Sequence, residues 1–322
     1  MYFLGLDVAK QSFQVVLLWA QKKRHKSFAN PPAGFHALQQ WLHQHCGDTP
    51  VHACLEATGS YSDALARFLA QHVQTVSLVN PARIKAFAQS QLQRTKTDRA
   101  DAALIAPYAA QVQPPAWLPP PPEITTLQAL VRHLDSLLDV RQQLRNRLTD
   151  GPQVAPVLAS LRTIITELEA EIAQVEQQIH DHIAGHPDLQ QTADLLDSIP
   201  GIGPLTAAKL LGEIEHLRAY THKDQVVAYA GLNPRERQSG TSIKGKPHLS
   251  KTGNARVRKA LYLPAVVALR HNPIIKQLGE RLTARGLCKM AIIGAAMRKL
   301  LQLVYGVVKS GQLFAPDFAK TA

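Results

Sequence analysis

The sequence has little cysteine, no long apolar run and fewer acidic than basic residues, and each shortage excludes a class of protein. Cys46, Cys54 and Cys288 are odd in number and scattered, which argues against a disulfide framework and is typical of a reducing compartment. No apolar run reaches the roughly 18–20 uninterrupted residues of a membrane span. The N-terminus lacks the basic and apolar regions of a signal peptide. We therefore expect no membrane partner and a location inside the cell.

The charge balance indicates the kind of partner. The 322 residues carry 36 Lys and Arg against 24 Asp and Glu, which gives a formal net charge of +12. Such an excess favours a polyanion, and without a membrane the simplest polyanion is nucleic acid. The chain is also long enough for at least two domains with cores of their own.

Strand-like and helical patterns alternate through the first hundred residues. They predict a mixed sheet flanked by helices, in which three strands form a meander and two later strands lie parallel to the first. On that layout Asp7 and Glu56 fall on neighbouring strands. The expected strands are residues 2–8, 13–20, 24–28, 51–57 and 73–79, and the expected helices are residues 33–46, 60–71 and 81–89.

Four carboxylates in this region have the pattern of a metal site. Asp7 lies inside an apolar run, Glu56 ends a second run, and Asp98 and Asp101 are spaced to share one face of a predicted helix. Oxygen ligands suit Mg²⁺, and two such ions can hold the attacking and leaving oxygens of a phosphodiester. Basic neighbours also allow Asp98 and Asp101 to form ordinary surface ion pairs. Asp7 is harder to explain in that way, because a carboxylate in an apolar strand is costly unless it is paired or bound to metal.

Clusters of prolines and the spacing of apolar residues divide the rest of the chain into further domains. Two clusters of prolines, at residues 114–115 and 119–122, form a stiff break, and apolar residues then recur at steps of three and four through two long stretches. These stretches predict an antiparallel helical hairpin or coiled coil that serves as a scaffold or an oligomer contact. We predict three domains: an acidic domain at residues 1–113, a helical hairpin at 123–186 and a mostly helical domain at 190–322.

The C-terminal region contains a motif that resembles a helix-hairpin-helix. Gly201 and Gly203 stand in a hydrophobic-Pro-Gly-hydrophobic-Gly pattern that is followed by a helix rich in small residues. In that motif the backbone N–H groups of the turn contact a DNA phosphate. An ordinary turn between two helices is the alternative.

Residues 235–259 form the strongest basic block, and hydroxyl and glycine residues are interspersed in it. The block predicts contact with phosphates. It also offers a nucleophile, because neighbouring cations can stabilise a serine alkoxide and a pentavalent phosphorus. Chemistry alone does not choose among Ser239, Ser242 and Ser250. The candidate nucleic-acid ligands are Arg235, Arg237, Lys244, Lys246, Lys251, Arg256 and Arg258.

Ordered motifs along the whole chain resemble one family. Gly5-Leu6-Asp7-Val8, Leu55-Glu56-Ala57-Thr58-Gly59 and Thr97-Asp98-Arg99-Ala100-Asp101 are similar to the three acidic motifs of the DEDD transposases. Those enzymes form the insertion-sequence one-hundred-and-ten family, which is related to the Piv invertase. The later motifs are similar to that family's second domain: Ile199-Pro200-Gly201-Ile202-Gly203, Tyr229-Ala230-Gly231-Leu232-Asn233-Pro234, Gln238-Ser239-Gly240 and Ser250-Lys251-Thr252-Gly253-Asn254.

The resemblance implies a fold and a reaction. It implies a RuvC-like, ribonuclease-H-type N-terminal domain that binds Mg²⁺ through Asp7, Glu56, Asp98 and Asp101, and a C-terminal domain in which Ser239 is the nucleophile. It further implies guidance by a noncoding bridge RNA that pairs with donor and target DNA. The working unit would be a dimer or tetramer in which one subunit's acids meet another's serine, acting near the nucleoid in the cytoplasm of a prokaryotic cell.

Two other functions fit parts of the pattern. A structure-selective nuclease of the Holliday-junction type requires the four acids and a basic surface but no serine. A noncatalytic nucleic-acid-binding protein requires only the basic surface. Our prediction is a transposase or recombinase that cuts and rejoins DNA at guided sites.

Overall fold

The computed structural model describes residues 1–30, 32–57, 59–91, 98–151, 153–239 and 243–316. The chain divides into two compact units, Met1–Pro119 and Pro120–Ala322. No observation tests the division into three domains at residues 1–113, 123–186 and 190–322, which stays a prediction.

Unit 1 is built on a five-stranded mixed sheet. Its strand order is β3-β2-β1-β4-β5, with β2 antiparallel to β1 and β3, and with β1, β4 and β5 parallel. The predicted meander and the parallel placement of the later strands are both confirmed. The strands are β1 (Tyr2–Val8), β2 (Ser12–Trp19), β3 (Lys22–Ala29), β4 (Val51–Glu56) and β5 (Thr75–Val79).

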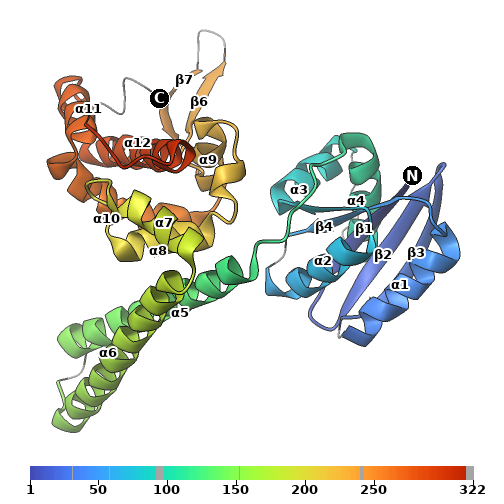
Figure 1. Ribbon diagram of the computed structural model, residues 1–322, viewed down its shortest axis with the longest axis horizontal. Coiled ribbons are helices and arrows are strands. Elements are labelled where there is room, and N and C mark those ends of the chain that lie inside the picture. The colour runs from blue at the N-terminus through green and yellow to red at the C-terminus, as the bar shows by residue number, and fades with distance from the viewer. Residues whose placement is uncertain (31, 58, 92–97, 152, 240–242, 317–322) are drawn as a thin grey trace. The chain divides into compact units, whose positions relative to one another are not determined.

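Helices cover both faces of this sheet (Figure 1). Alternate residues of a strand point to opposite faces, so Leu4 and Leu6 share a core with α1 and α2, whereas Cys54 packs with α3 and α4. This mixed α/β layering is consistent with a RuvC-like domain. The helices are α1 (Pro32–Cys46), α2 (Ser60–His72), α3 (Pro81–Ser90) and α4 (Asp98–Val112).

Gly5 allows α4 to lie directly on the centre of the sheet. A Cβ atom at this position would be 2.4 Å from the Ala106 nitrogen and 2.6 Å from the Ala102 oxygen, and both are backbone atoms of α4. The facing residues of the helix, Ala102 and Ala106, are small and pack with Val16. The small side chains on both elements therefore fix the distance between α4 and the strands, and with it the position of the first turn of α4.

The proline-rich segment that ends unit 1 is held along the edge strand β5. The Trp117 nitrogen donates to the Val76 oxygen at 2.7 Å, and the Ser77 hydroxyl lies 3.0 and 2.8 Å from the carbonyl oxygens of Pro114 and Pro115. His52 Nε2 is 2.8 Å from the same hydroxyl. Burial lowers the pKa of His52, and the Ser77 hydroxyl donates to the carbonyl oxygens of the segment.

Unit 2 is mostly helical, as predicted. Two long helices form a hairpin whose base shares one core with the helices that follow. A helix-hairpin-helix and a coiled coil stay predictions. The elements of unit 2 are α5 (Pro122–Asp150), α6 (Ala155–Ala184), α7 (Pro187–Asp197), α8 (Pro204–Glu213), a 3₁₀ turn (Leu217–Ala219), α9 (Lys223–Ala230), β6 (Pro234–Ser239), β7 (Ile243–Leu249), α10 (Ala255–His271), α11 (Pro273–Ala284) and α12 (Lys289–Ser310).

Among the helices of the described residues, α12 alone is long and apolar enough to cross a membrane by length and composition. Its most apolar window has a mean hydropathy of 1.5, and 56% of that window is buried within the protein. Leu300, Leu301 and Val304 are fully buried in the core of unit 2. The helix is therefore packed as a core helix, and its composition is weak evidence for a membrane.

Candidate active site

The predicted acids Asp7 and Glu56 lie at matching positions on adjacent parallel strands. The register of β1 and β4 runs from Tyr2 opposite Val51 to Leu6 opposite Leu55, and each acid is the next residue of its strand. Neighbouring strands are about 4.8 Å apart, and residues at matching positions point to the same face. The sheet therefore brings two carboxylates together at the carboxyl end of its central strands.

The alternation of side chains shows which face these acids occupy. Leu6 and Leu55 belong to the core under α1 and α2, so their successors Asp7 and Glu56 point to the face that α4 covers. Both acids are only partly buried. Partial exposure suits a site that must admit a phosphodiester from solvent.

Helix α4 brings its first turn toward the same end of β1. Ala102 and Ala106 lie over Gly5, and the later residues Tyr108 and Ala109 belong to the cluster against which Phe3 packs. The helix therefore runs opposite to β1 and begins near the end of the strand that carries Asp7.

Asp98 and Asp101 both occupy that first turn of α4. Asp101 is partly buried, whereas the side chain of Asp98 lies outside the described part of the chain. The backbone thus directs the first turn of α4, which carries Asp98 and Asp101, toward the end of the sheet at which Asp7 and Glu56 lie.

The four positions fit a hard divalent cation by the chemistry of their donors. All are carboxylates, the ligands that Mg²⁺ prefers. Among the residues whose side chains are described, no three Asp, Glu, His or Cys side chains approach closely enough to form a metal cluster. The complete quartet also requires Asp98, so its geometry as a metal site stays a prediction.

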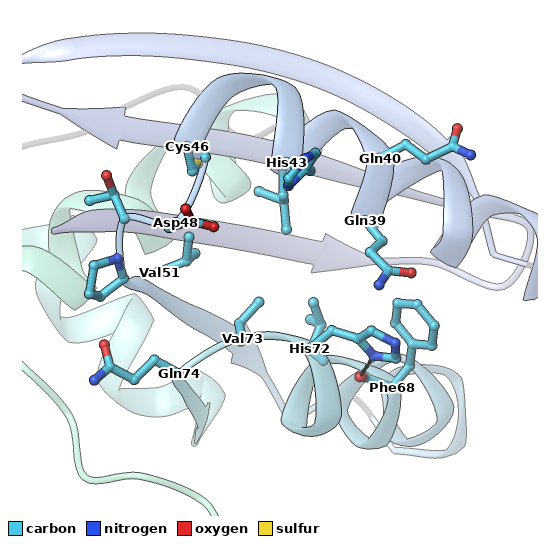
Figure 2. A pocket seen from close by; sticks show the side chains of 15 residues that line it. Gln39, Gln40, His43, Cys46, Asp48, Val51, Phe68, His72, Val73 and Gln74 are labelled. Atoms are coloured by element: carbon cyan, nitrogen blue, oxygen red, sulfur yellow. Dashed lines mark hydrogen bonds between the residues drawn. The ribbon is translucent and has the colours of Figure 1, made fainter.

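A pocket in unit 1 lies at the opposite end of the sheet. Figure 2 shows this pocket of about 670 Å³ between the last turns of α1 and α2, with His43, Cys46, Asp48 and His72 among the residues that line it. Burial raises the pKa of the Cys46 thiol to about 11, so this cysteine is not a reactive thiolate. The pocket includes Val51, the first residue of β4, and lies away from Glu56, the last.

In unit 2 the predicted nucleophile Ser239 ends the first strand of a β-hairpin. Strand β6 pairs with β7 from Pro234 opposite Leu249 to Ser239 opposite Ile243, with an irregularity between Arg235 and Arg237. Ser239 therefore stands at the tip of the hairpin. Ser242 and the side chains of Ser239, Arg237, Lys244 and Lys246 lie outside the described part of the chain.

The base of this hairpin is tied together by loops 229–233 and 250–254. The Ser250 nitrogen donates to the Asn233 oxygen at 3.0 Å, and the Ser250 hydroxyl donates to Asn233 Oδ1 at 2.8 Å. The Lys251 nitrogen, at a left-handed φ of 54°, donates to the Gly231 oxygen at 3.1 Å. Ser250 thus has a role in holding the two strands at their base.

Gly253 is required where these two loops cross. Its φ is 144°, and a Cβ atom there would lie 2.3 Å from the Tyr229 oxygen and 2.7 Å from the Gly231 nitrogen. Arg258 reaches the same crossing and donates to the carbonyl oxygens of Ala230 and Gly253 at 2.8 and 3.2 Å. Arg258, predicted as a nucleic-acid ligand, therefore also holds the loops together, while Arg235 and Lys251 remain exposed.

The sequence analysis missed Glu213, a buried carboxylate next to these loops. It is 3% exposed, and it accepts hydrogen bonds from Arg132 at 2.7 and 3.1 Å and from Asn254 Nδ2 at 3.1 Å. The hydrogen bond to Glu213 raises the pKa of Arg132. Arg256, another predicted nucleic-acid ligand, lies 3.9 Å from this carboxylate.

The position of Glu213 links the long helix α5 to the start of α10. Arg132 lies on α5, and Asn254 caps α10 by accepting from the nitrogens of Arg256 and Val257. One signal for Glu213 was present in the sequence, because an acid in the apolar run Leu210-Leu211-Gly212-Glu213-Ile214 is costly without partners.

The glycines of the predicted helix-hairpin-helix lie in the turn between α7 and α8. Gly201 has a φ of 106°, and a Cβ atom there would lie 2.8 Å from the Ala268 Cβ and 2.9 Å from the Pro264 oxygen. This glycine is therefore explained by close packing against α10, without a phosphate. Gly203 precedes α8 and has open space around it.

Comparison with known proteins gives the family. Residues 4–151 match a family model of the DEDD type described as transposase. Residues 193–280 match the model described as the transposase IS116/IS110/IS902 family.

Curated relatives extend over nearly the whole chain. The pilin gene-inverting protein of Moraxella bovis is 34% identical over 314 residues, 97% of each chain. The transposase for insertion sequence element IS1111A of Coxiella burnetii is 23% identical over 308 residues, 83% of this chain and 78% of its own. The protein therefore belongs to the IS110 family of transposases, whose members cut and rejoin DNA.

Proposed function

We propose that this protein is an RNA-guided DNA recombinase of an insertion sequence, with a Mg²⁺–carboxylate site in unit 1 and a serine nucleophile in unit 2. The observation that carries the proposal is the placement of Asp7 and Glu56 at matching positions on β1 and β4, at the end of the sheet toward which the first turn of α4 points. Membership of the family supplies the substrate class, DNA.

Each acid has a part in this proposal. Asp7, Glu56, Asp98 and Asp101 hold Mg²⁺, which when bound stabilises charge on the oxygens of the scissile phosphate. The sheet register supports the part given to the two strand-borne acids, and the contact of α4 with Gly5 supports the part given to the two helix-borne acids. The arrangement orients the phosphate without movement of the backbone.

Ser239 is the nucleophile in this proposal. Its hydroxyl oxygen attacks phosphorus and forms a phosphoserine linkage, its proton passes to a base or to water, and the bond from phosphorus to the leaving sugar oxygen breaks. The linkage conserves the phosphodiester for rejoining, when a sugar hydroxyl displaces the serine. The position at the tip of a two-stranded hairpin supports this role, because the tip of a hairpin can enter another subunit's acidic site. We therefore propose a dimer or tetramer with composite sites.

Guidance by a bridge RNA completes the proposal. Base pairing of the RNA with donor and target DNA would select the sites, while the protein would hold backbone and duplex shape. The exposed cations Arg235 and Lys251 at the base of the hairpin are suited to backbone contact.

Reconstitution with purified parts tests this proposal. The protein is mixed with donor and target DNA and with the RNA transcribed from the noncoding DNA that flanks its gene. We expect recombinant junctions only when both the RNA and Mg²⁺ are present, and none after chelation with EDTA. Junctions formed equally well without RNA would contradict guidance. Cleavage of a four-way junction without RNA and without rejoining would support a nuclease instead.

A further inference from the structure

Strand β3 lies at the outer edge of the sheet (Figure 1), and it carries a continuous run of basic residues. The run is Lys22, Lys23, Arg24, His25 and Lys26, and all five are exposed. β3 pairs with β2 on one side only, so the other edge faces solvent. The sequence has no Asp or Glu between Asp7 and Asp48, so the charge of this strand is not balanced locally along the chain.

The sheet register relates this run to the acidic site. Asp7 of β1 pairs with Gln14 of β2, and Gln14 pairs with Ser27 of β3, to which it also donates a side-chain hydrogen bond of 3.1 Å. These three residues are level and share a face of the sheet. By alternation His25 and Lys23 point to that face. Lys22, Arg24 and Lys26 point to the other face. The basic run therefore begins at Lys26, one residue from the level of Asp7 and about two strand spacings or ~10 Å from β1, and extends along the edge away from Asp7.

The opposite face of β3 presents its cations over aromatic rings. The Arg24 guanidinium lies 5.5 Å from the centre of the Trp19 ring, and the Lys26 ammonium lies 5.1 Å from the centre of the Phe28 ring. These rings are thus covered by charge and offer no open platform on which a base can stack. A surface of this kind suits a phosphate backbone better than single-stranded bases, which bind through aromatic stacking.

No salt bridge within the described part of the chain joins Lys22, Lys23, Arg24 or Lys26 to a carboxylate. A charged residue on an edge strand also prevents pairing with another sheet, but one or two lysines suffice for that purpose. Consecutive like charges repel each other, and a polyanion relieves the repulsion. Cations on one face recur about every 6.7 Å along a strand, a regular row for the phosphates of one DNA strand.

We propose that β3 is a docking surface for the phosphate backbone of duplex DNA, which leaves the acidic site and continues along the edge of the sheet. The proposal rests on the proposed function for the identity of the polyanion. The proposed contact is with phosphates, which carry no sequence information, so it should be independent of base sequence. It extends the DNA interface of unit 1 beyond the four acids.

The test is the salt dependence of DNA binding by the full-length protein, measured by fluorescence anisotropy in EDTA so that no cleavage occurs. In the variant Lys22→Gln/Lys23→Gln/Arg24→Gln/Lys26→Gln we expect affinity for a duplex to fall at least about tenfold near physiological salt. The slope of log K against log salt should fall by about 3. Two duplexes of unrelated sequence should lose affinity in the same ratio.

A matched control removes the same charge elsewhere. Lys276→Gln/Arg281→Gln/Arg285→Gln/Lys289→Gln changes four exposed cations at the surface of unit 2, and we expect a loss of less than about threefold and a nearly unchanged slope. An equal loss in both variants would overturn the proposal, as would retention of duplex affinity by the β3 variant. Loss of affinity for a structured RNA alone, with duplex binding intact, would also overturn it.

Two further variants keep the result interpretable. Lys22→Arg/Lys23→Arg/Lys26→Arg retains the charge and should bind as the wild type does. If the glutamine variant aggregates through its edge strand, the single changes Lys23→Gln and Lys26→Gln should each lower the slope by about 1. Asp7→Asn should bind DNA in EDTA at least as well as the wild type, so a failure of the acidic-site proposal is distinguishable from a failure of this one.

Discussion

Replacement of Asp7 by Asn is expected to abolish strand cleavage and recombination while leaving the fold intact. Asn keeps the size of the side chain but removes the negative charge that a divalent cation requires. Loss of several kcal/mol of transition-state stabilisation corresponds to a decrease of at least about 10³-fold in the cleavage rate. The measurement is single-turnover cleavage of labelled donor DNA in the presence of Mg²⁺ and the flanking RNA.

Asp63→Asn is the matched control for Asp7→Asn. Asp63 lies on α2 in the same unit, half-exposed, in an ion pair of 3.1 Å with Arg67. An exposed pair of this kind contributes at most about 1 kcal/mol, so cleavage should remain within about twofold of the wild type. Cleavage by Asp7→Asn at the wild-type rate, with Mg²⁺ present, would contradict the metal-site account. Thermal unfolding should show that Asp7→Asn is no less stable than the wild type, because two neighbouring carboxylates repel without a cation.

Replacement of Ser239 by Ala is expected to eliminate both the covalent protein–DNA adduct and strand exchange. The hydroxyl oxygen is the atom that forms the bond to phosphorus, and alanine has no substitute for it. The backbone of β6 is retained, so the hairpin and DNA binding should persist. The measurement is a denaturing gel on which a covalent adduct migrates as a protein-bound DNA band.

Ser250→Ala is the control that separates chemistry from structure. This serine loses its hydrogen bond to Asn233 at the base of the hairpin, which should lower stability by about 1 kcal/mol without removing the adduct. An adduct retained by Ser239→Ala and lost by Ser242→Ala would identify Ser242 as the nucleophile. Metal-dependent cleavage by Ser239→Ala without any adduct in the wild type would favour the nuclease alternative.

The sequence predicted the sheet well where a strand is a continuous apolar run. Strand β1 was expected at residues 2–8 and occupies Tyr2–Val8, because its apolar residues serve two buried faces. Strand β3 was expected only at residues 24–28 but begins at Lys22. Its charged residues carry no apolar alternation, and the strand forms because β2 pairs with it along its whole length.

The hairpin of β6 and β7 was not predicted. Its strands are polar and basic, and the expectation for residues 190–322 was a mostly helical domain. The hairpin is held by contacts of the residues that flank its strands. The two loops cross at Gly253, and Ser250 forms hydrogen bonds to Asn233. Long-range contacts of this kind leave no periodic pattern.

The sequence was enough to predict the acids of the candidate site, but not the residues that support the sites from distant parts of the chain. Asp7 and Glu56 were identified because acids in apolar strands are costly, and the register then placed them at matching positions. Glu213 was missed although it obeys the same rule, because its partner Arg132 is distant in the sequence. The role of Gly5 in seating α4 also depends on a contact across about a hundred residues.

The most direct test of the acidic site is anomalous diffraction from crystals of the protein soaked in Mn²⁺, which substitutes for Mg²⁺ and scatters anomalously. The account predicts a peak between the carboxylates of Asp7 and Glu56, beside the first turn of α4, and no peak at that place in Asp7→Asn. A peak only at another part of the molecule, or none at Mn²⁺ concentrations that support cleavage, would contradict it.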